Sequence, residues 1–223
     1  SSDLVTDPEH GRLGRRREVV AAAREGGMRI IGPAALGIIN TDPEVRLNAS
    51  LAPEVPRRDS IGFFCQSGAL GIDILARVQR RGLGVSSFVS AGNRADVSGN
   101  DLLQFWEEDD DTDVIMLYLE SMGNVGKFLR LARRIGRNKP IVTLRTTGAM
   151  SVHPLGHDVP VSHLQEKARE QLFAASGIID AGSLDEMLDI AEVLRLRGLP
   201  EGNRLGLVGN DSAVATLARN EIG

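Results

Sequence analysis

Short apolar runs alternate with helical patterns along most of this chain. The most continuous run is DVIMLYLE at 113–120, which is typical of a central strand in a parallel sheet. Together with shorter runs it predicts five strands, at 61–65, 87–90, 113–120, 139–145 and 177–180. Helical spacing between them predicts helices at 69–81, around 102–106, and at 125–135, 164–175 and 184–196.

This alternation predicts an α/β fold with a doubly wound, parallel five-stranded sheet. In such folds the functional groups gather at the carboxyl ends of the strands. Candidate functional residues are therefore expected directly after each apolar run.

The two flanks do not fit the same pattern. RREVVAAAREGGMRIIGPAALGIIN (16–40) predicts a helix, a Gly-Gly stop and a strand, and 199–223 predicts a turn, one strand and one helix. A lone βα unit cannot bury its own apolar face. We therefore interpret both flanks as partial pieces of neighbouring domains, with boundaries at 1–56, 57–198 and 199–223.

Composition narrows the function classes. The chain has 26 Lys and Arg against 30 Asp and Glu and only 4% aromatic residues, which argues against a nucleic-acid partner. Its single cysteine, Cys65, fits a reducing cytoplasm, and no apolar stretch is long enough to cross a membrane. The sequence predicts a soluble cytoplasmic protein.

The turn after the first predicted strand is the first candidate site. Gln66-Ser67-Gly68-Ala69 joins the strand directly to a helix, and small residues there let backbone N–H groups approach an anion. The same residues also suit an ordinary strand-to-helix turn. The pattern alone leaves both interpretations open.

Two further candidates lie after later strands. Glu120 follows the 113–120 run and is placed either to orient a histidine or to face solvent. The long segment 146–163 holds His153, His157 and His163. No cysteine or paired carboxylate stands at ligand spacing, so no metal site is expected. A loop histidine that carries a transferred group is one interpretation, and an ordinary surface loop is the other.

Several longer motifs carry a family resemblance. They are GPAALGIIN, CQSGALG, VSAGNRADVSGNDLLQFWEEDDDTDVIMLYLES, KPIVTLR and AASGIIDAGSLDEMLD, which together span most of the chain from about 28 to 210. With them the sequence resembles the NDP-forming acyl-CoA synthetases, the group related to succinyl-CoA synthetase. The resemblance implies a flavodoxin-like ligase domain at 57–198, after the end of a CoA-binding Rossmann-like domain.

The resemblance also implies roles for individual residues. The turn at Gln66, Ser67, Gly68 and Ala69 would hold a phosphoryl group, and Glu120 would hold the catalytic histidine, which aligns at His157. Gly32, Pro33 and Asn93 would lie on the side that binds CoA or acyl-CoA. ATP or ADP with Mg²⁺ would bind through an ATP-grasp domain or subunit outside this chain.

This sequence departs from the family at two motifs. Gly32-Pro33-Ala34-Ala35 stands where the family has Gly-Pro-Asn-Cys, and no histidine is followed by the usual Thr-Gly or Ala-Gly. The alternative function is therefore an inactive ligand-binding module that regulates a fused protein acetyltransferase. In either case we expect no turnover by this stretch alone, and association with itself or a partner.

Overall fold

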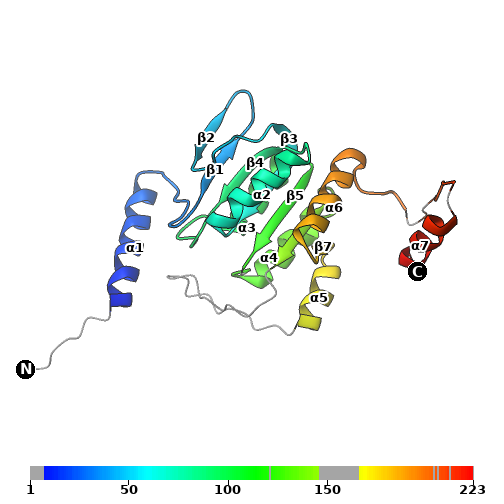
Figure 1. Ribbon diagram of the computed structural model, residues 1–223. Coiled ribbons are helices and arrows are strands. Elements are labelled where there is room, and N and C mark those ends of the chain that lie inside the picture. The colour runs from blue at the N-terminus through cyan, green and yellow to red at the C-terminus, as the bar shows by residue number, and fades with distance from the viewer. Residues whose placement is uncertain are drawn as a thin grey trace, which may run out of the picture.

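The computed structural model describes residues 8–120, 122–145, 166–202, 204, 206–210 and 212–222. Its centre is a seven-stranded sheet in the order β2-β1-β4-β3-β5-β6-β7, covered by helices on both faces (Figure 1). The α/β fold expected from the alternating pattern is confirmed.

The five predicted strands form the parallel part of the sheet. They are β3 (Arg58–Cys65), β4 (Val85–Ser90), β5 (Val114–Leu119), β6 (Ile141–Arg145) and β7 (Ile178–Ala181). Each pairs in parallel with its neighbours in the order β4-β3-β5-β6-β7. Every residue of β5 is buried, as its unbroken apolar run predicts.

Two more strands extend the sheet beyond β4. β1 (Gly37–Asn40) and β2 (Leu47–Ser50) form an antiparallel hairpin, and β1 also pairs antiparallel with β4. The strand expected in the front flank therefore joins the central sheet. Residues 28–36, ahead of β1, contain no strand.

The helices divide between the two faces of the sheet. α2 (Gly68–Arg80) and α6 (Leu184–Arg197) bury apolar side chains against one face. α3 (Gly99–Glu108), α4 (Val125–Ile135) and α5 (Glu166–Ala174) pack on the other. Each face therefore has its own hydrophobic core.

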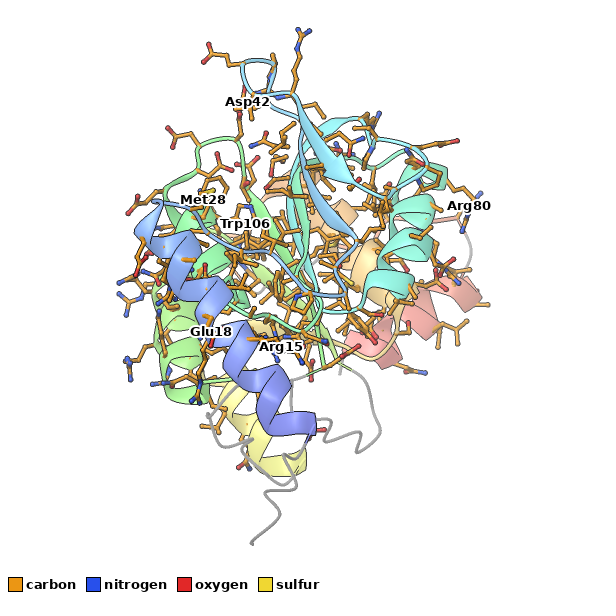
Figure 2. The ribbon with its side chains drawn as sticks, turned by 90° about the vertical axis from the view of Figure 1, so that its left-hand side faces the viewer. Arg15, Glu18, Met28, Asp42, Arg80 and Trp106 are labelled. Atoms are coloured by element: carbon orange, nitrogen blue, oxygen red, sulfur yellow. The ribbon has the colours of Figure 1, made fainter. Side chains whose placement is uncertain are left out.

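The two remaining helices lie outside these layers. α1 (Pro8–Glu25) ends at Gly26-Gly27, as the sequence predicts, and Figure 2 shows it crossing in front of the domain, with Arg15 and Glu18 labelled. α7 (Ser212–Ile222) leaves Val214 and Leu217 exposed. The strand predicted ahead of α7 is absent from the described residues 206–210.

A close contact at Gly62 fixes the distance between β3 and α3. A Cβ atom at Gly62 would lie 2.6 Å from Cε2 of Trp106, which is fully buried (Figure 2). The indole Nε1 of Trp106 donates a hydrogen bond of 2.8 Å to Oγ of Ser87. Two paired strands of the sheet, β3 and β4, thus hold the ring, which has little room to move.

We predict that Gly62→Ala lowers the free energy of unfolding by about 2 kcal/mol, because the added methyl group forces a packed indole to shift. Urea denaturation followed by circular dichroism and by the fluorescence of Trp106, the only tryptophan, measures the change. Gly202→Ala is the matched control, since nothing lies within 4 Å of a Cβ atom there. Equal stabilities for the two variants would contradict the prediction.

Candidate functional site

The carboxyl ends of three parallel strands bring the candidate residues to one edge of the sheet. Cys65 at the end of β3 is in register with Ser90 of β4 and with Tyr118 of β5. The turn after β3, the loop after β4 and Glu120 after β5 therefore emerge side by side. This is the edge at which doubly wound folds bind their ligands.

The turn after β3 presents the N-terminus of α2. Ser67 is the N-cap residue, and its Oγ accepts a hydrogen bond of 3.3 Å from the N–H of Leu70. The first turn of a helix also has N–H groups that no intrahelical carbonyl can reach. The N–H groups of Gly68 and Ala69 are therefore the donors that this turn can direct at an anion.

Gln66 connects this turn to Glu120. The Gln66 side chain is buried, and its Oε1 accepts a hydrogen bond of 2.7 Å from the backbone N–H of Glu120. Its own N–H donates to the carbonyl oxygen of Tyr118 at 3.3 Å. Gln66 thus positions the backbone of Glu120, and the sequence did not reveal this contact. The contact of Gln66 with phosphate stays a prediction.

The carboxylate of Glu120 is exposed at this edge, and its charge reaches the neighbouring Cys65. Burial raises the pKa of the Cys65 thiol to about 12; a hydrogen bond with the Ser67 backbone acts in the opposite direction, and the charge of Glu120 raises the pKa further. The thiol is therefore protonated at neutral pH and acts as a small buried side chain. Glu120 remains free to accept a hydrogen bond from a partner at the edge.

The predicted CoA-side residues Gly32, Pro33 and Asn93 lie together. The N–H of Asn93 donates to the Pro33 carbonyl at 2.9 Å, and the N–H of Ala95 donates to the Gly32 carbonyl at 2.8 Å. Arg16 of α1 donates from Nη2 to the Asn93 carbonyl at 2.6 Å. These backbone groups bind one another, so they shape the edge of the site.

The segment 33–34 can approach this edge because two of its neighbours are glycines without side chains. A Cβ atom at Gly92, where φ is +51°, would lie 2.4 Å from the carbonyl oxygens of both Pro33 and Ala34. A Cβ atom at Gly68 would lie 3.2 Å from the same Ala34 oxygen. The predicted phosphate turn and the predicted CoA side are therefore in direct contact.

Asp96, in the loop after β4, clamps the segment that leads from α1. Its carboxylate is fully buried and accepts hydrogen bonds of 2.6 Å from both Arg24 and Arg29, and one of 3.0 Å from the N–H of Ile30. Burial alone would raise the pKa of Asp96, but these hydrogen bonds lower it by more, to about 2. The clamp holds the 33–34 segment against the site.

A pocket of about 200 Å³ opens beside Gln66, on the α3 and α4 side of the sheet. Arg94 and Asn100, both buried, line it together with Lys127 of α4. Ser98 is the N-cap residue of α3, and its N–H and Oγ both donate to the Asp101 carboxylate. Asn100 instead turns into the protein.

His157, the predicted phosphoryl carrier, lies outside the described residues, as do His153 and His163. Within the ranges that are described, no group of three His, Cys, Asp or Glu side chains could hold a metal ion. None of the helices described here has the length and apolar character needed to span a membrane.

The sheet order and the helices on both of its faces define a flavodoxin-like domain. Residues 58–194 match the family described as succinyl-CoA ligase like flavodoxin domain. The chain belongs to this family, and the resemblance carried by its motifs is confirmed.

Relatives of established activity share this sequence over most of its length. It is 34% identical over 207 residues to ADP-forming acetate–CoA ligase I of Archaeoglobus fulgidus. This match covers 91% of this chain and 29% of the relative. It is 33% identical over 221 residues to the alpha subunit of ADP-forming acetate–CoA ligase II of Pyrococcus furiosus. This second match covers 96% of this chain and 47% of the relative. The chain therefore spans less than half the length of these relatives.

A solved structure shows the same arrangement. The dinucleotide-forming acetyl-coenzyme A synthetase 1 of Ca. Korarchaeum cryptofilum, in complex with phosphate and ADP, superposes with a TM-score of 0.81 at 31% identity. The match covers 100% of this chain and 48% of that one.

We predict that Asp96→Asn lowers the free energy of unfolding at pH 7 by about 2 kcal/mol, because the ionised form is favoured in the folded state. The folded pKa of about 2 lies below the ordinary value of 3.8, so this stabilisation is present above about pH 4 and lost as the pH falls toward 2. Urea denaturation between pH 7 and pH 3 should show the two proteins converging on acidification. Asp73→Asn, which removes an exposed pair with Arg77, should change stability by less than about 0.5 kcal/mol. A pH-independent difference between Asp96→Asn and the parent would refute the account.

We also predict that Ala34→Gly stabilises the protein by about 0.5–1 kcal/mol. Ala34 has a φ of +58°, a left-handed conformation in which a Cβ atom is strained and glycine is not. Ala35→Gly is the control. It should instead destabilise the protein by a similar amount, because it only raises the conformational entropy of the unfolded chain. Thermal denaturation should show a higher melting temperature for Ala34→Gly and a lower one for Ala35→Gly. A loss of stability in both variants would contradict the prediction.

Proposed function

We propose that this chain is part of an NDP-forming acyl-CoA synthetase and contains the domain in which a histidine carries the phosphoryl group. The observation that carries the proposal is the contact among the predicted site residues at one sheet edge. The turn at Ser67, the backbone of Glu120 and the segment 33–34 are joined there by short hydrogen bonds and close packing. The relatives with acetate–CoA ligase activity point to the same reaction class.

The proposed reaction has three balanced steps. Phosphate displaces the thiol of CoA from an acyl-CoA, which gives an acyl phosphate. An imidazole nitrogen of His157 attacks the phosphorus, and the carboxylic acid leaves with the electrons of the broken bond. The phosphohistidine then transfers its phosphoryl group to an NDP, which gives the NTP and regenerates the histidine.

The described residues have clear tasks in this scheme. The N–H groups of Gly68 and Ala69, at the positive end of α2, stabilise the negative charge of the phosphoryl group. The carboxylate of Glu120 accepts the second N–H of the imidazole and keeps the attacking nitrogen unprotonated. Gln66 fixes the position of the backbone from which the Glu120 side chain extends.

The proposed domain layout places this domain at 57–198. Residues 1–56 belong to the end of a CoA-binding domain, and their β1–β2 hairpin adds two strands to the sheet of the 57–198 domain. Gly32, Pro33 and Asn93 lie on the acyl-CoA side, and 199–223 begin a second flavodoxin-like domain. NDP or NTP with Mg²⁺ binds through an ATP-grasp domain or subunit. We place the working enzyme in the cytoplasm, as an assembly of more than one copy.

A second candidate function is an inactive acyl-CoA-binding module that regulates a protein acetyltransferase. The specific observation in its favour is Ala34, which contacts the turn at Gly68 through its backbone but brings no polar side chain to the site. A polar donor lost from such a site weakens transition-state stabilisation. The two candidates differ in whether His157 is phosphorylated.

Phosphohistidine formation on the full-length protein tests the proposal. With its ATP-grasp domain present, the protein should take up label from ATP and Mg²⁺ in an acid-labile, base-stable form. His157→Ala should abolish the label, and Glu120→Gln should lower the labelling rate by about 10²-fold or more, because the imidazole loses its orienting carboxylate. His163→Ala is the matched control and should be labelled normally.

Absence of label in the parent protein, with acyl-CoA binding retained, would overturn the ligase and support the regulatory module. Label that persists in His157→Ala would show that another residue carries the group.

A further inference from the structure

α1 contacts the loop after β4 at a second place, separate from the Asp96 clamp. Arg16 donates from Nη2 to the carbonyl oxygen of Asn93 at 2.6 Å, although the two residues are 77 positions apart in the sequence. Burial lowers the pKa of the Arg16 guanidinium, which nevertheless stays protonated in proteins. The contact is therefore a charge-assisted hydrogen bond between a helix and a distant loop.

Polar contacts of this kind hold α1 against the domain (Figure 2). None of its described side chains, at residues 15–25, is buried, and Val19 is 60% exposed. The Asp96 clamp binds Arg24 near the end of the helix, and Arg16 binds the loop two turns earlier. Because apolar packing contributes little to its docking, the position of α1 depends on these arginine contacts.

The backbone that Arg16 binds belongs to a turn of unusual conformation. Arg94 has a φ of +47°, in the left-handed region that few residues other than glycine adopt. Its N–H closes the turn on the Ala91 carbonyl at 3.0 Å, and the N–H of Asn93 donates to the Pro33 carbonyl. A conformation of this kind persists where the surrounding structure fixes it. Arg16 and Pro33 bind the two polar groups of the Asn93 backbone and so fix the turn from both sides.

The turn places Arg94 at the carboxyl edge of the sheet. Arg94 is 5% exposed and lines the pocket beside Gln66, whose side chain holds the backbone of Glu120. Burial lowers the pKa of the Arg94 guanidinium, the Glu120 carboxylate raises it, and the charge of Arg16 lowers it. The three charged groups are therefore within electrostatic reach of one another. A buried cation at this edge suits the negative charge of a transferring phosphoryl group.

We infer that Arg16 is a positioning residue for Arg94. It holds the Asn93 carbonyl, which fixes the left-handed turn, and the position of the buried Arg94 side chain therefore depends on the docking of α1. Like charges disfavour the approach of the two guanidinium groups, so the bond to Asn93 has to outweigh their repulsion. The contribution of Arg94 to phosphoryl transfer rests on the proposed function, whereas the positioning contact does not.

Removal of Arg16 should change the position of the turn more than the stability of the fold. The backbone of Asn93 keeps its hydrogen bond to Pro33, and water can take the place of the guanidinium because the contact is only partly buried. The turn then loses one of the contacts that fix it. Arg16→Met thus separates the two effects.

¹⁵N NMR on the 223-residue chain tests the positioning contact without any ligand or activity. The Nε–H signal of Arg94, assigned with Arg94→Lys, should exchange slowly with solvent because the side chain is buried. Arg16→Met should speed this exchange by about tenfold or more and shift the amide signal of Asn93, with the free energy of unfolding in urea unchanged.

Two further variants make the comparison specific. Arg16→Lys should keep the exchange within about threefold of the parent, because an ammonium group can also donate to the Asn93 carbonyl. Arg133→Met removes a charge from an exposed position on α4 and should leave the Arg94 signal unchanged.

A double-mutant cycle on the full-length protein tests whether Arg16 acts through Arg94. The rate of phosphohistidine labelling should fall by about tenfold or more in Arg94→Met and by about threefold or more in Arg16→Met. The double variant should be no slower than Arg94→Met, because the position of the turn no longer matters once the guanidinium is gone. Arg94→Lys takes the place of Arg94→Met if the methionine variant does not fold.

The possible results separate this inference from the proposed function. Unchanged exchange of the Arg94 signal in Arg16→Met, or losses of rate that multiply in the double variant, would overturn the positioning role. A parent protein that takes up no label would refute the ligase, and the NMR comparison then decides the positioning role by itself.

Discussion

The carboxyl edge of the sheet depends on the close approach of the 33–34 backbone to Gly68 and Gly92. Carbonyl oxygens of this segment occupy the space that a Cβ atom would need at Gly92, and nearly so at Gly68. Side chains at these two positions would push the segment away from the α2 N-terminus. The hydrogen bond from Asn93 to Pro33 and the buried Asp96 carboxylate then hold the segment from the other side. The predicted phosphoryl turn and the predicted CoA side are thereby adjacent.

The parallel sheet was predictable because its strands are buried on both faces. β5 is therefore a continuous apolar run and β3 ends in one. Ser67 and Asn124 mark the starts of the helices that follow these two strands. The β1–β2 hairpin was missed for the opposite reason. β2 is the exposed sequence LNAS, with no apolar face to reveal it, and the strand that β1 joins lies far along the chain. Pairing of this kind is decided by tertiary contacts, which local sequence patterns do not contain.

The candidate site was predictable to the same extent. Ser67 and Glu120 follow strands directly, so strand order alone places them at one edge. The roles of Gln66, Arg94 and Asn100 were not visible, because each depends on where a side chain turns after a loop closes. Asn100 stands inside the capping box that Ser98 and Asp101 form, and its residue type does not show where its amide turns. The packing of α3 beside α4 places Asn100 at the pocket.

The two faces of the sheet differ in a way that stability alone does not explain. The face covered by α2 and α6 is sealed by aliphatic and aromatic side chains. The other face has an equally apolar core around Trp106 and Phe128, but at its carboxyl end it also buries Arg94, Gln66 and Asn100. Burying a cation and two amides requires desolvation that apolar residues of similar volume would avoid. These groups stand together at the edge of the sheet where doubly wound folds bind their ligands.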